Sequence, residues 1–325
     1  MRHLFSISAY DFDINEYGGA SEAVRRMKEA GADGAELLTG YFDPDPVIGS
    51  FAEGIHLPYA TDWYSAWSGD TGYIDMVSDE NIRYRSYGRS REDMVITLRE
   101  AMIHASSVSP AYGVLHASNT RMDEVMGFAY RDKDEDVLHA LADLMNRAVS
   151  SFDGGEPPFR IVFENIWWPG LRMTDDSGYD TLLGSLDFDN WGLCLDTGHL
   201  MNCLAGCRYE EESIDDVLRI IGSYPQEMRG RIDVVHLHMS LSAEYRDECI
   251  TRPKTYDVTN DDEMISKAYE HVCKIDQHRP FSSRRCTEIV DALNPEYVTH
   301  EISAPTSTER LSGFSGQRSL FLAKR

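Results

Sequence analysis

The feature that most constrains the fold is a regular alternation of short apolar runs with helix-like segments along the whole chain. Most of the apolar runs end in polar or charged residues. This is typical of parallel strands that are buried on both faces and open into a site at their carboxyl ends. We expect eight strands, at residues 3–8, 34–38, 54–59, 113–117, 160–165, 192–196, 233–238 and 297–302.

The segments between these runs carry apolar residues at helical spacing. Residues 20–30 place Ala23, Val24 and Met27 on one face before Gly31 ends the pattern. Similar helices are expected at residues 91–107, 134–152, 215–224, 262–274 and 284–293. No Gly-x-Gly-x-x-Gly motif follows the first strand, so a dinucleotide-binding sheet has no support. The alternation therefore predicts a single (β/α)8 TIM barrel over residues 1–325.

Two connections are too long to be simple links between a strand and a helix. They cover residues 60–90, which are rich in Tyr, Trp, Gly and Asp, and residues 240–261. Long loops after barrel strands usually form lids or substrate walls. No linker, repeat or low-complexity stretch divides the chain, so we expect one domain with two elaborated loops.

The charge of the chain limits its partners. Asp and Glu number 55 against 31 Lys and Arg, a net charge of −24. This field would repel a long polyanion, because nucleic-acid binding depends on a basic surface. No apolar run approaches membrane-spanning length, and the six cysteines are scattered without the pattern of a disulfide scaffold. We expect a cytoplasmic protein with a small-molecule substrate; the oligomeric state stays open.

Six consecutive predicted strands, from the third to the eighth, end in histidine or carboxylate residues. A lone residue of this kind is more often a hydrogen-bonded group or a helix cap. In a barrel, however, all the strand ends meet at one mouth, where unpaired charges are costly and divalent ions would satisfy them. The predicted metal ligands are His56, His116, Glu164, Asp196, His199, His236 and Glu301.

Strand alternation adds two details to this ligand set. His236 and His238 should face the same side, so His238 is a candidate additional ligand, whereas His300 should point away from the site. Imidazole together with carboxylate suits zinc, manganese, iron or cobalt better than magnesium or calcium. The ligands outnumber those of one tetrahedral ion, so we expect two divalent ions bridged by Glu164.

The strand ends also carry the motifs of a known superfamily: His56-Leu57-Pro58-Tyr59, Phe163-Glu164-Asn165, Leu195-Asp196-Thr197-Gly198-His199-Leu200 and Val235-His236-Leu237. From about the second strand to the eighth, the chain resembles the xylose isomerase-like TIM barrels, which include endonuclease IV and many sugar isomerases and epimerases. The resemblance implies one divalent ion held by Glu164, Asp196, His236 and Glu301. It also implies that Glu164 and Glu301 are the catalytic pair that moves protons.

The endonuclease IV branch implies three further metal-binding histidines, which match His56, His116 and His199. That branch also has an Asp-x-His pair after the seventh strand. Residues 239–248 contain no histidine, so Asp247 and His238 are the candidate substitutes and a binuclear site is expected. The seventh strand, with His-Leu-His followed by an Asp, is also similar to the cobamide-remodelling phosphodiesterases, which act on a small cofactor.

Three residues outside the ligand set are candidates for substrate binding. Trp167 and Trp168 follow Glu164 and could form a wall for a ring or pack beneath the fifth loop. Arg246 follows the seventh strand and could bind a phosphate or stay solvated. Glu36 ends the second strand, facing the site or making an ion pair.

Together these observations favour a metal-dependent hydrolase of a small phosphoester or phosphodiester, such as a nucleotide-like cofactor or a sugar phosphate, that uses metal-activated water. The extra histidines carry this interpretation, because a one-metal isomerase does not require them. The alternative is a divalent-metal-dependent sugar or sugar-phosphate isomerase or epimerase with Glu164 and Glu301 as the acid and base. A third interpretation is a barrel that keeps its metal or cofactor site for binding only.

Overall fold

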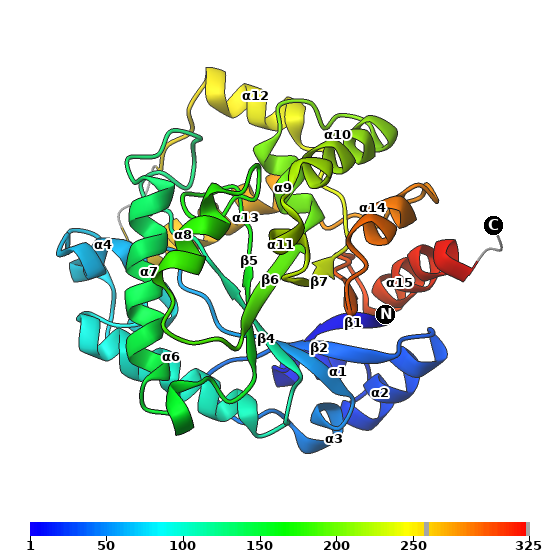
Figure 1. The fold of residues 1–325 in the computed structure, drawn as a ribbon, viewed down its shortest axis with the longest axis horizontal. Helices are drawn as coiled ribbons and strands as arrows, with labels where there is room; N and C mark the ends of the chain where they lie inside the picture. Colours follow the sequence, from blue (N-terminus) through cyan, green and yellow to red (C-terminus); the bar gives the residue numbers. More distant parts are fainter. Residues whose placement is uncertain (257–259, 323–325) are drawn as a thin grey trace.

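Eight parallel strands form a closed barrel in the computed structural model of the chain, which describes residues 1–256 and 260–322 (Figure 1). Strands that follow one another in sequence are neighbours in the barrel, and the eighth pairs with the first. The strands are β1 (Arg2–Ser8), β2 (Gly34–Leu38), β3 (Ala52–His56), β4 (Tyr112–His116), β5 (Arg160–Glu164), β6 (Trp191–Asp196), β7 (Ile232–His236) and β8 (Tyr297–His300). The predicted (β/α)8 fold is confirmed.

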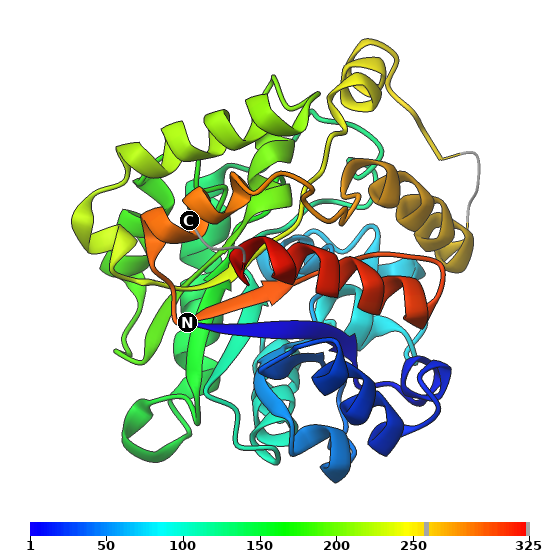
Figure 2. The same cartoon turned by 90° about the vertical axis from the view of Figure 1, so that its right-hand side faces the viewer.

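Helices surround the barrel, and the longer ones run along its outside (Figures 1 and 2). Within the described residues, no helix is both long and apolar enough to span a bilayer. The helices are α1 (Asp11–Glu16), α2 (Ala20–Glu29), α3 (Pro46–Gly49), α4 (Trp63–Ser68), α5 (Ile82–Ser86), α6 (Arg91–Ser106), α7 (Asp134–Val149), α8 (Ser177–Ser185), α9 (Thr197–Cys203), α10 (Glu210–Ser223), α11 (Gln226–Arg229), α12 (Ala243–Thr251), α13 (Asp261–Ile275), α14 (Cys286–Leu293) and α15 (Ser307–Leu322), with 3-10 turns η1 (Ile74–Met76) and η2 (Asp153–Gly155).

The barrel wall explains why its strands are apolar on both faces. In β6 every residue is buried: Leu193 and Leu195 join the large core shared with the helices, whereas Cys194 belongs to a small cluster of its own. Alternation then points Asp196 inward, as it does Cys194. The small cluster consists of Leu4, Tyr112, Val114, Val162, Cys194, Val234 and Tyr297. It packs inside the barrel, beneath the strand-end ligands that gather at the mouth.

The predicted strands all occur, but several end earlier than expected. β3 ends at His56 and β7 at His236, although the apolar pattern continues for two or three residues. After β3 the backbone N–H of Leu57 still donates to Val114, but Pro58 has no N–H to continue the ladder. The residues just beyond the strands therefore leave the sheet and enter the loops of the mouth.

Both long connections contain packed structure rather than open loop. Residues 60–90 include α4, η1 and α5, and the buried Trp63 indole donates to the Ser118 carbonyl at 2.8 Å. Residues 240–261 include α12, and residues 257–259 of this predicted loop lie outside the described part of the chain. The Trp63 hydrogen bond ties the first connection to the segment that follows β4.

Candidate metal centre

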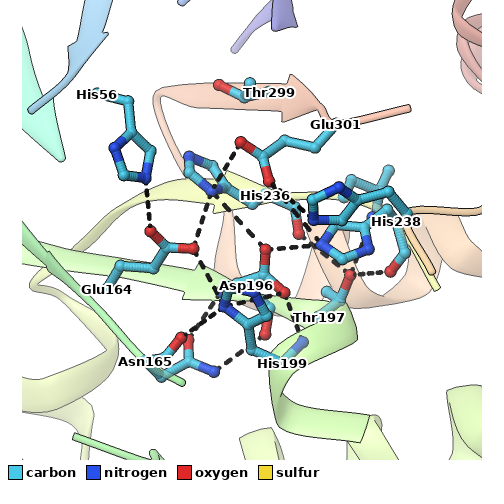
Figure 3. A network of polar contacts seen from close by, with 12 residues as sticks. His56, Glu164, Asn165, Asp196, Thr197, His199, His236, His238, Thr299 and Glu301 are labelled. Carbon is cyan, nitrogen blue, oxygen red and sulfur yellow. Dashed lines mark hydrogen bonds and ion pairs between the residues drawn. The ribbon is translucent and has the colours of Figure 1, made fainter. Parts of the chain in front are cut away.

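Glu164 lies at the centre of the barrel mouth and contacts four histidines (Figure 3 shows His56, His199 and His236). Its Oε2 lies 3.1 Å from Nε2 of His56 and 3.1 Å from Nε2 of His116. Its Oε1 lies 3.2 Å from Nδ1 of His199 and 3.2 Å from Nδ1 of His236. The side chain is only 1% exposed. Each carboxylate oxygen therefore faces a different pair of ring nitrogens. Glu164 thus links the pair His56 and His116 to the pair His199 and His236.

Asp196 occupies the turn from β6 into α9 and has two roles. Its Oδ1 accepts the backbone N–H of His199 at 2.6 Å, which caps α9 and directs the His199 side chain into the mouth. Its Oδ2 lies 2.8 Å from Nε2 of His238. The Thr197 hydroxyl donates to the His238 carbonyl at 2.5 Å and so ties α9 to the segment after β7. The Asp-Thr-Gly-His motif thus positions residues on two elements at once.

Gly198 is required by the close approach of the His238 ring. A Cβ at this position would lie 2.1 Å from Cε1 and 2.4 Å from Nδ1 of His238, far inside van der Waals contact. Both atoms belong to a fully buried ring that has no room to withdraw. The glycine of the motif is therefore explained by the neighbouring histidine rather than by backbone conformation.

A third group of ligands lies beside Asp196, and the sequence interpretation missed half of it. Oδ2 of Asp276 lies 3.2 Å from Nε2 of His199 and 2.9 Å from Nε2 of His278. These two residues follow α13, and they return to β7 because Met239 and Arg279 exchange backbone hydrogen bonds. Asp276-Gln277-His278 is an Asp-x-His pair after the seventh strand. It lies well beyond residues 239–248, where the sequence analysis looked for such a pair.

Three groups of candidate ligands therefore adjoin one another. Within each group the ligand atoms all lie within 4.8 Å of one another, and Glu164 belongs to two of the groups. The groups are His56, His116 and Glu164; Glu164, Asp196, His236 and Glu301; and His199, His238, Asp276 and His278.

The surroundings of the ligands fit divalent metal ions. Nδ1 of His56 donates to the Leu57 carbonyl at 3.0 Å, so its Nε2 is free to face the mouth. Nε2 of His236 lies 3.0 Å from Oε1 of Glu36, so its Nδ1 faces the other ligands. Metal-binding histidines characteristically have such an outer partner, which fixes the ring and its tautomer. Imidazole and carboxylate donors without thiolate are the ligand types of zinc, manganese, iron and cobalt sites.

Several solved structures share the fold of the chain over nearly its whole length. Endonuclease IV from Thermus thermophilus is similar with a TM-score of 0.53 at 12% identity, over 99% of this chain and 99% of that one. A D-tagatose 3-epimerase-like protein gives 0.53 at 13% identity, over 99% and 97%. The chain shares the barrel fold of these two proteins. An L-ribulose 3-epimerase gives 0.51 at 12% identity, over 98% and 92%. No protein-family model and no curated protein sequence matches.

Pairing between carboxylates and histidines dominates the electrostatics of the barrel mouth. Burial alone would raise the pKa of the Glu164 carboxyl, but His116 and His236 hold it well below its usual range. Burial alone would lower the pKa of His199, but Asp196 and other carboxylates raise it well above its usual range. Protons carried by histidines such as His199 therefore balance the negative charge of the buried carboxylates. Metal ions would replace these protons, so binding should release them.

Glu36 lies inside the barrel, beneath the ligands. It is fully buried, and its Oε2 accepts hydrogen bonds from the Tyr112 hydroxyl at 2.6 Å and the Thr299 hydroxyl at 2.9 Å. Burial alone would raise the pKa of this carboxyl, but His236 holds it below its usual range. Glu36 therefore belongs to the support of the site, as the partner that orients the His236 ring.

The substrate-binding candidates of the sequence analysis have other contacts in the structure. Trp167 and Trp168 are buried in a cluster with Met122, Val125 and residues of α13, and the Trp167 ring centroid lies 5.2 Å from that of His199. Arg246 is buried and donates to the Met201 carbonyl at 3.1 Å and to two carbonyls just after it. These contacts stabilise the loops around the site, and Arg246 is not available as an exposed phosphate ligand.

Asp247 and His300 lie away from the ligand groups. Asp247 is on α12, where its half-exposed carboxylate pairs with Arg208, and Asp276 is the aspartate that meets His199 and His278. His300 faces outward, as alternation predicts, and its ring nitrogens contact His3 at 2.9 Å and the Gln317 amide at 2.8 Å. The remaining predicted ligands, including His238 and Glu301, belong to the three groups.

Proposed function

We propose that the chain is a metal-dependent hydrolase of a small phosphodiester. The observation that carries this proposal is the third ligand group, which stands beside the two groups that share Glu164. A one-metal isomerase needs only Glu164, Asp196, His236 and Glu301. The additional histidines and Asp276 are not needed as ligands of that single ion, whereas a phosphoryl transfer site that clamps both the attacking and the leaving oxygen uses several ions.

The ligand groups would hold the ions in the following way. His56 and His116 with Oε2 of Glu164 would hold one ion, and Asp196, His236 and Glu301 with Oε1 of Glu164 would hold a second. The third group would complete the set. When bound, divalent ions supply positive charge for the phosphate oxygens and activate a water molecule for attack. Because the carboxylates are buried and negatively charged, they would hold the positive ions in a fixed arrangement before the substrate arrives.

The size and charge of the site support a small substrate. A cavity of about 540 Å³ opens over His56, His116 and Glu164, which is the size of a small-molecule site. The net charge of −24 opposes a long polyanion. A phosphodiester within a small molecule satisfies both conditions.

The second candidate is a sugar or sugar-phosphate epimerase or isomerase. The comparisons support it at least as well as the hydrolase, because the D-tagatose 3-epimerase-like protein is as similar as endonuclease IV and the L-ribulose 3-epimerase is close behind. In this candidate Glu164 and Glu301 would face each other across one ion and move a substrate proton.

Metal analysis of the purified protein together with two activity assays separates the candidates. We expect more than one zinc, manganese, iron or cobalt ion per chain and release of p-nitrophenol from bis(p-nitrophenyl) phosphate. Asp276→Asn and His278→Ala should lower both the metal content and the hydrolysis. Asp247→Asn, a change of the same kind outside the three groups, should lower neither.

The opposite outcome is equally defined. A single ion per chain, no hydrolysis and exchange of a sugar α-proton with deuterated solvent would contradict the hydrolase and support the epimerase. In that case Asp276→Asn should leave the exchange unchanged.

A further inference from the structure

The cavity over the ligand groups extends to a rim that carries exposed aromatic side chains. Phe12 on α1 and Tyr269 on α13 are 76% and 70% exposed, and both line the cavity. A third ring, that of Tyr59, stacks on His116 with centroids 4.2 Å apart and also lines it. The three rings come from loops and helices after β1, β3 and β7, so they surround the opening from different sides.

The wall between these rings is largely aliphatic on one side. Ile7, Leu38, Ile302, Ala304 and Pro305 line the same cavity, at the ends of β1 and β2 and in the loop after β8. In Figure 2, β1 (blue) and β8 (orange) point to the same side, and α13 (gold) lies there as well. Aromatic and aliphatic walls around a few polar groups are the usual composition of a site for an organic ring.

The charges outside the ligand groups limit what else the cavity can bind. Among the described residues that line it, Arg310 is the one lysine or arginine. Its guanidinium lies 2.8 Å from Asp13 and also pairs with Glu16, and both carboxylates line the cavity. This part of the site therefore has one positive charge and two negative charges. A second phosphate on the substrate would find no free cation there and would meet a net negative charge.

We propose that the aromatic rim binds an uncharged, ring-bearing group that is esterified to the phosphate, so that the substrate is a diester with a single negative charge. The inference rests on the proposed hydrolase function and adds the class of substrate. The metal ligands would take the one charged phosphate, while Phe12 and Tyr269 would pack on the ring. Polyphosphates and substrates with a second phosphate group would be excluded by Asp13 and Glu16.

Three esters with the same leaving group test this proposal: methyl p-nitrophenyl phosphate, thymidine 5′-(p-nitrophenyl phosphate) and the 3′-phosphorylated form of the latter. We expect kcat/KM to be about tenfold higher for the thymidine ester than for the methyl ester, since stacking of a base on an aromatic ring contributes roughly 1–3 kcal/mol. The added 3′-phosphate should lower it again by about tenfold.

Variants of the rim localise the effect. Phe12→Ala and Tyr269→Ala should each lower kcat/KM for the thymidine ester by about tenfold and change that for the methyl ester by less than about twofold. Tyr209→Ala is the matched control, because Tyr209 is 65% exposed and does not line the cavity. Equal kcat/KM for the methyl and thymidine esters, or a preference for the 3′-phosphorylated ester, would overturn the ring proposal while the hydrolase stands.

Binding measurements keep the two proposals separate. Calorimetric titration of the zinc-loaded protein with thymidine 5′-(methyl phosphate) and with dimethyl phosphate measures the affinity for each compound. The difference between the two affinities gives the contribution of the ring without turnover. Tighter binding of the thymidine compound, lost in Phe12→Ala and Tyr269→Ala, supports the rim even if no ester is hydrolysed. Equal affinity for the two compounds overturns it.

Discussion

Buried histidines occur on both faces of the barrel wall, and their surroundings are opposite. At the mouth, His199 and His236 lie against carboxylates that raise the pKa of each ring well above its usual range, although burial opposes the shift. Behind the wall, His3 and His300 lie against each other and against α15. There burial lowers the pKa of His3 to about 4 and that of His300 well below its usual range.

The difference shows what a strand histidine indicates about function. Both sets are buried and both belong to strand ends or to the segments next to them, so burial and position do not separate them. The carboxylate neighbours do: a histidine that faces several carboxylates sits in a site that can hold a cation, whereas a histidine hydrogen-bonded to neutral groups is part of the packing. Four experiments test this contrast, from the largest expected effect to the smallest.

Glu164→Gln should have the largest effect, because it removes a charge that two ligand groups share. We expect loss of bound metal and a decrease of about 1,000-fold in hydrolysis, as several kcal/mol of charge stabilisation disappear. Metal content by mass spectrometry and kcat on bis(p-nitrophenyl) phosphate measure the two losses. Glu135→Gln, at an exposed site on α7, is the control. Full metal content in Glu164→Gln would remove the basis of the proposed centre.

His3→Gln tests the histidines behind the barrel wall through the pH dependence of folding stability. The pKa of His3 falls from 6.5 in the unfolded chain to about 4 in the folded one. The unfolded state therefore binds more protons between these values, and stability falls as the pH drops from 6.5 to 4. This single group accounts for about 3 kcal/mol of that loss. Urea unfolding at several pH values should show that His3→Gln loses less stability over this window than the wild type. Parallel pH profiles would contradict the neutral, buried state of His3.

Gly198→Ala should disturb the mouth through the His238 ring alone. The new methyl group would overlap the ring, and overpacking of this kind costs about 2 kcal/mol. We expect a lower melting temperature and a reduced metal content from the third ligand group. Gly316→Ala on α15 is the matched control, since nothing lies within 4 Å of its Cβ position, and it should be neutral or slightly stabilising. Equal effects of the two changes would argue against a special role for Gly198.

Glu36→Gln should have the smallest effect, because Glu36 orients a ligand without belonging to a ligand group. Loss of its charge beside Nε2 of His236 should weaken metal binding by about tenfold, as for other outer partners of metal-binding histidines. Competition with a chromophoric chelator measures the affinity. Tyr112→Phe removes a different partner of Glu36 and should change it less. An unchanged affinity in Glu36→Gln would show that the strand alone fixes the ring.

The barrel and most of the candidate site could be predicted from the sequence, for one physical reason. In a parallel barrel the carboxyl ends of all strands lie at the same mouth. Strand-end residues such as His56, Glu164 and Asp196 therefore meet there, in the order of their strands around the barrel. Asp276 and His278 could not be placed in this way, because they come from a loop beyond two helices. The Asp-x-His spacing was visible, but its return to β7 depends on the Met239–Arg279 pairing.

Two other departures have equally local causes. Helix α15 was not predicted because Gly313, Gly316 and several serines weaken its helical pattern, and the packing of Phe314 against His300 stabilises it instead. For Trp167 the sequence left substrate binding and packing beneath the fifth loop open, and for Arg246 it left phosphate binding and solvation open. The loops here are deep enough to bury both. Tertiary packing decided each of these cases.

Asp276 and His278 lie at the far end of the long segment between β7 and α14, and His238 lies at its start. Metal ions bound by all three would link the two ends of this segment. The Met239–Arg279 pairing, the packing of α13 against Trp167 and Trp168 and the ion pair of Asp261 with Arg85 already hold parts of this loop, and closing a long loop costs chain entropy. Ions bound by residues at both its ends would offset that entropy. The segment that carries α12 and α13 would thus gain part of its rigidity from the metal, and an increase in its protease resistance would report metal loading.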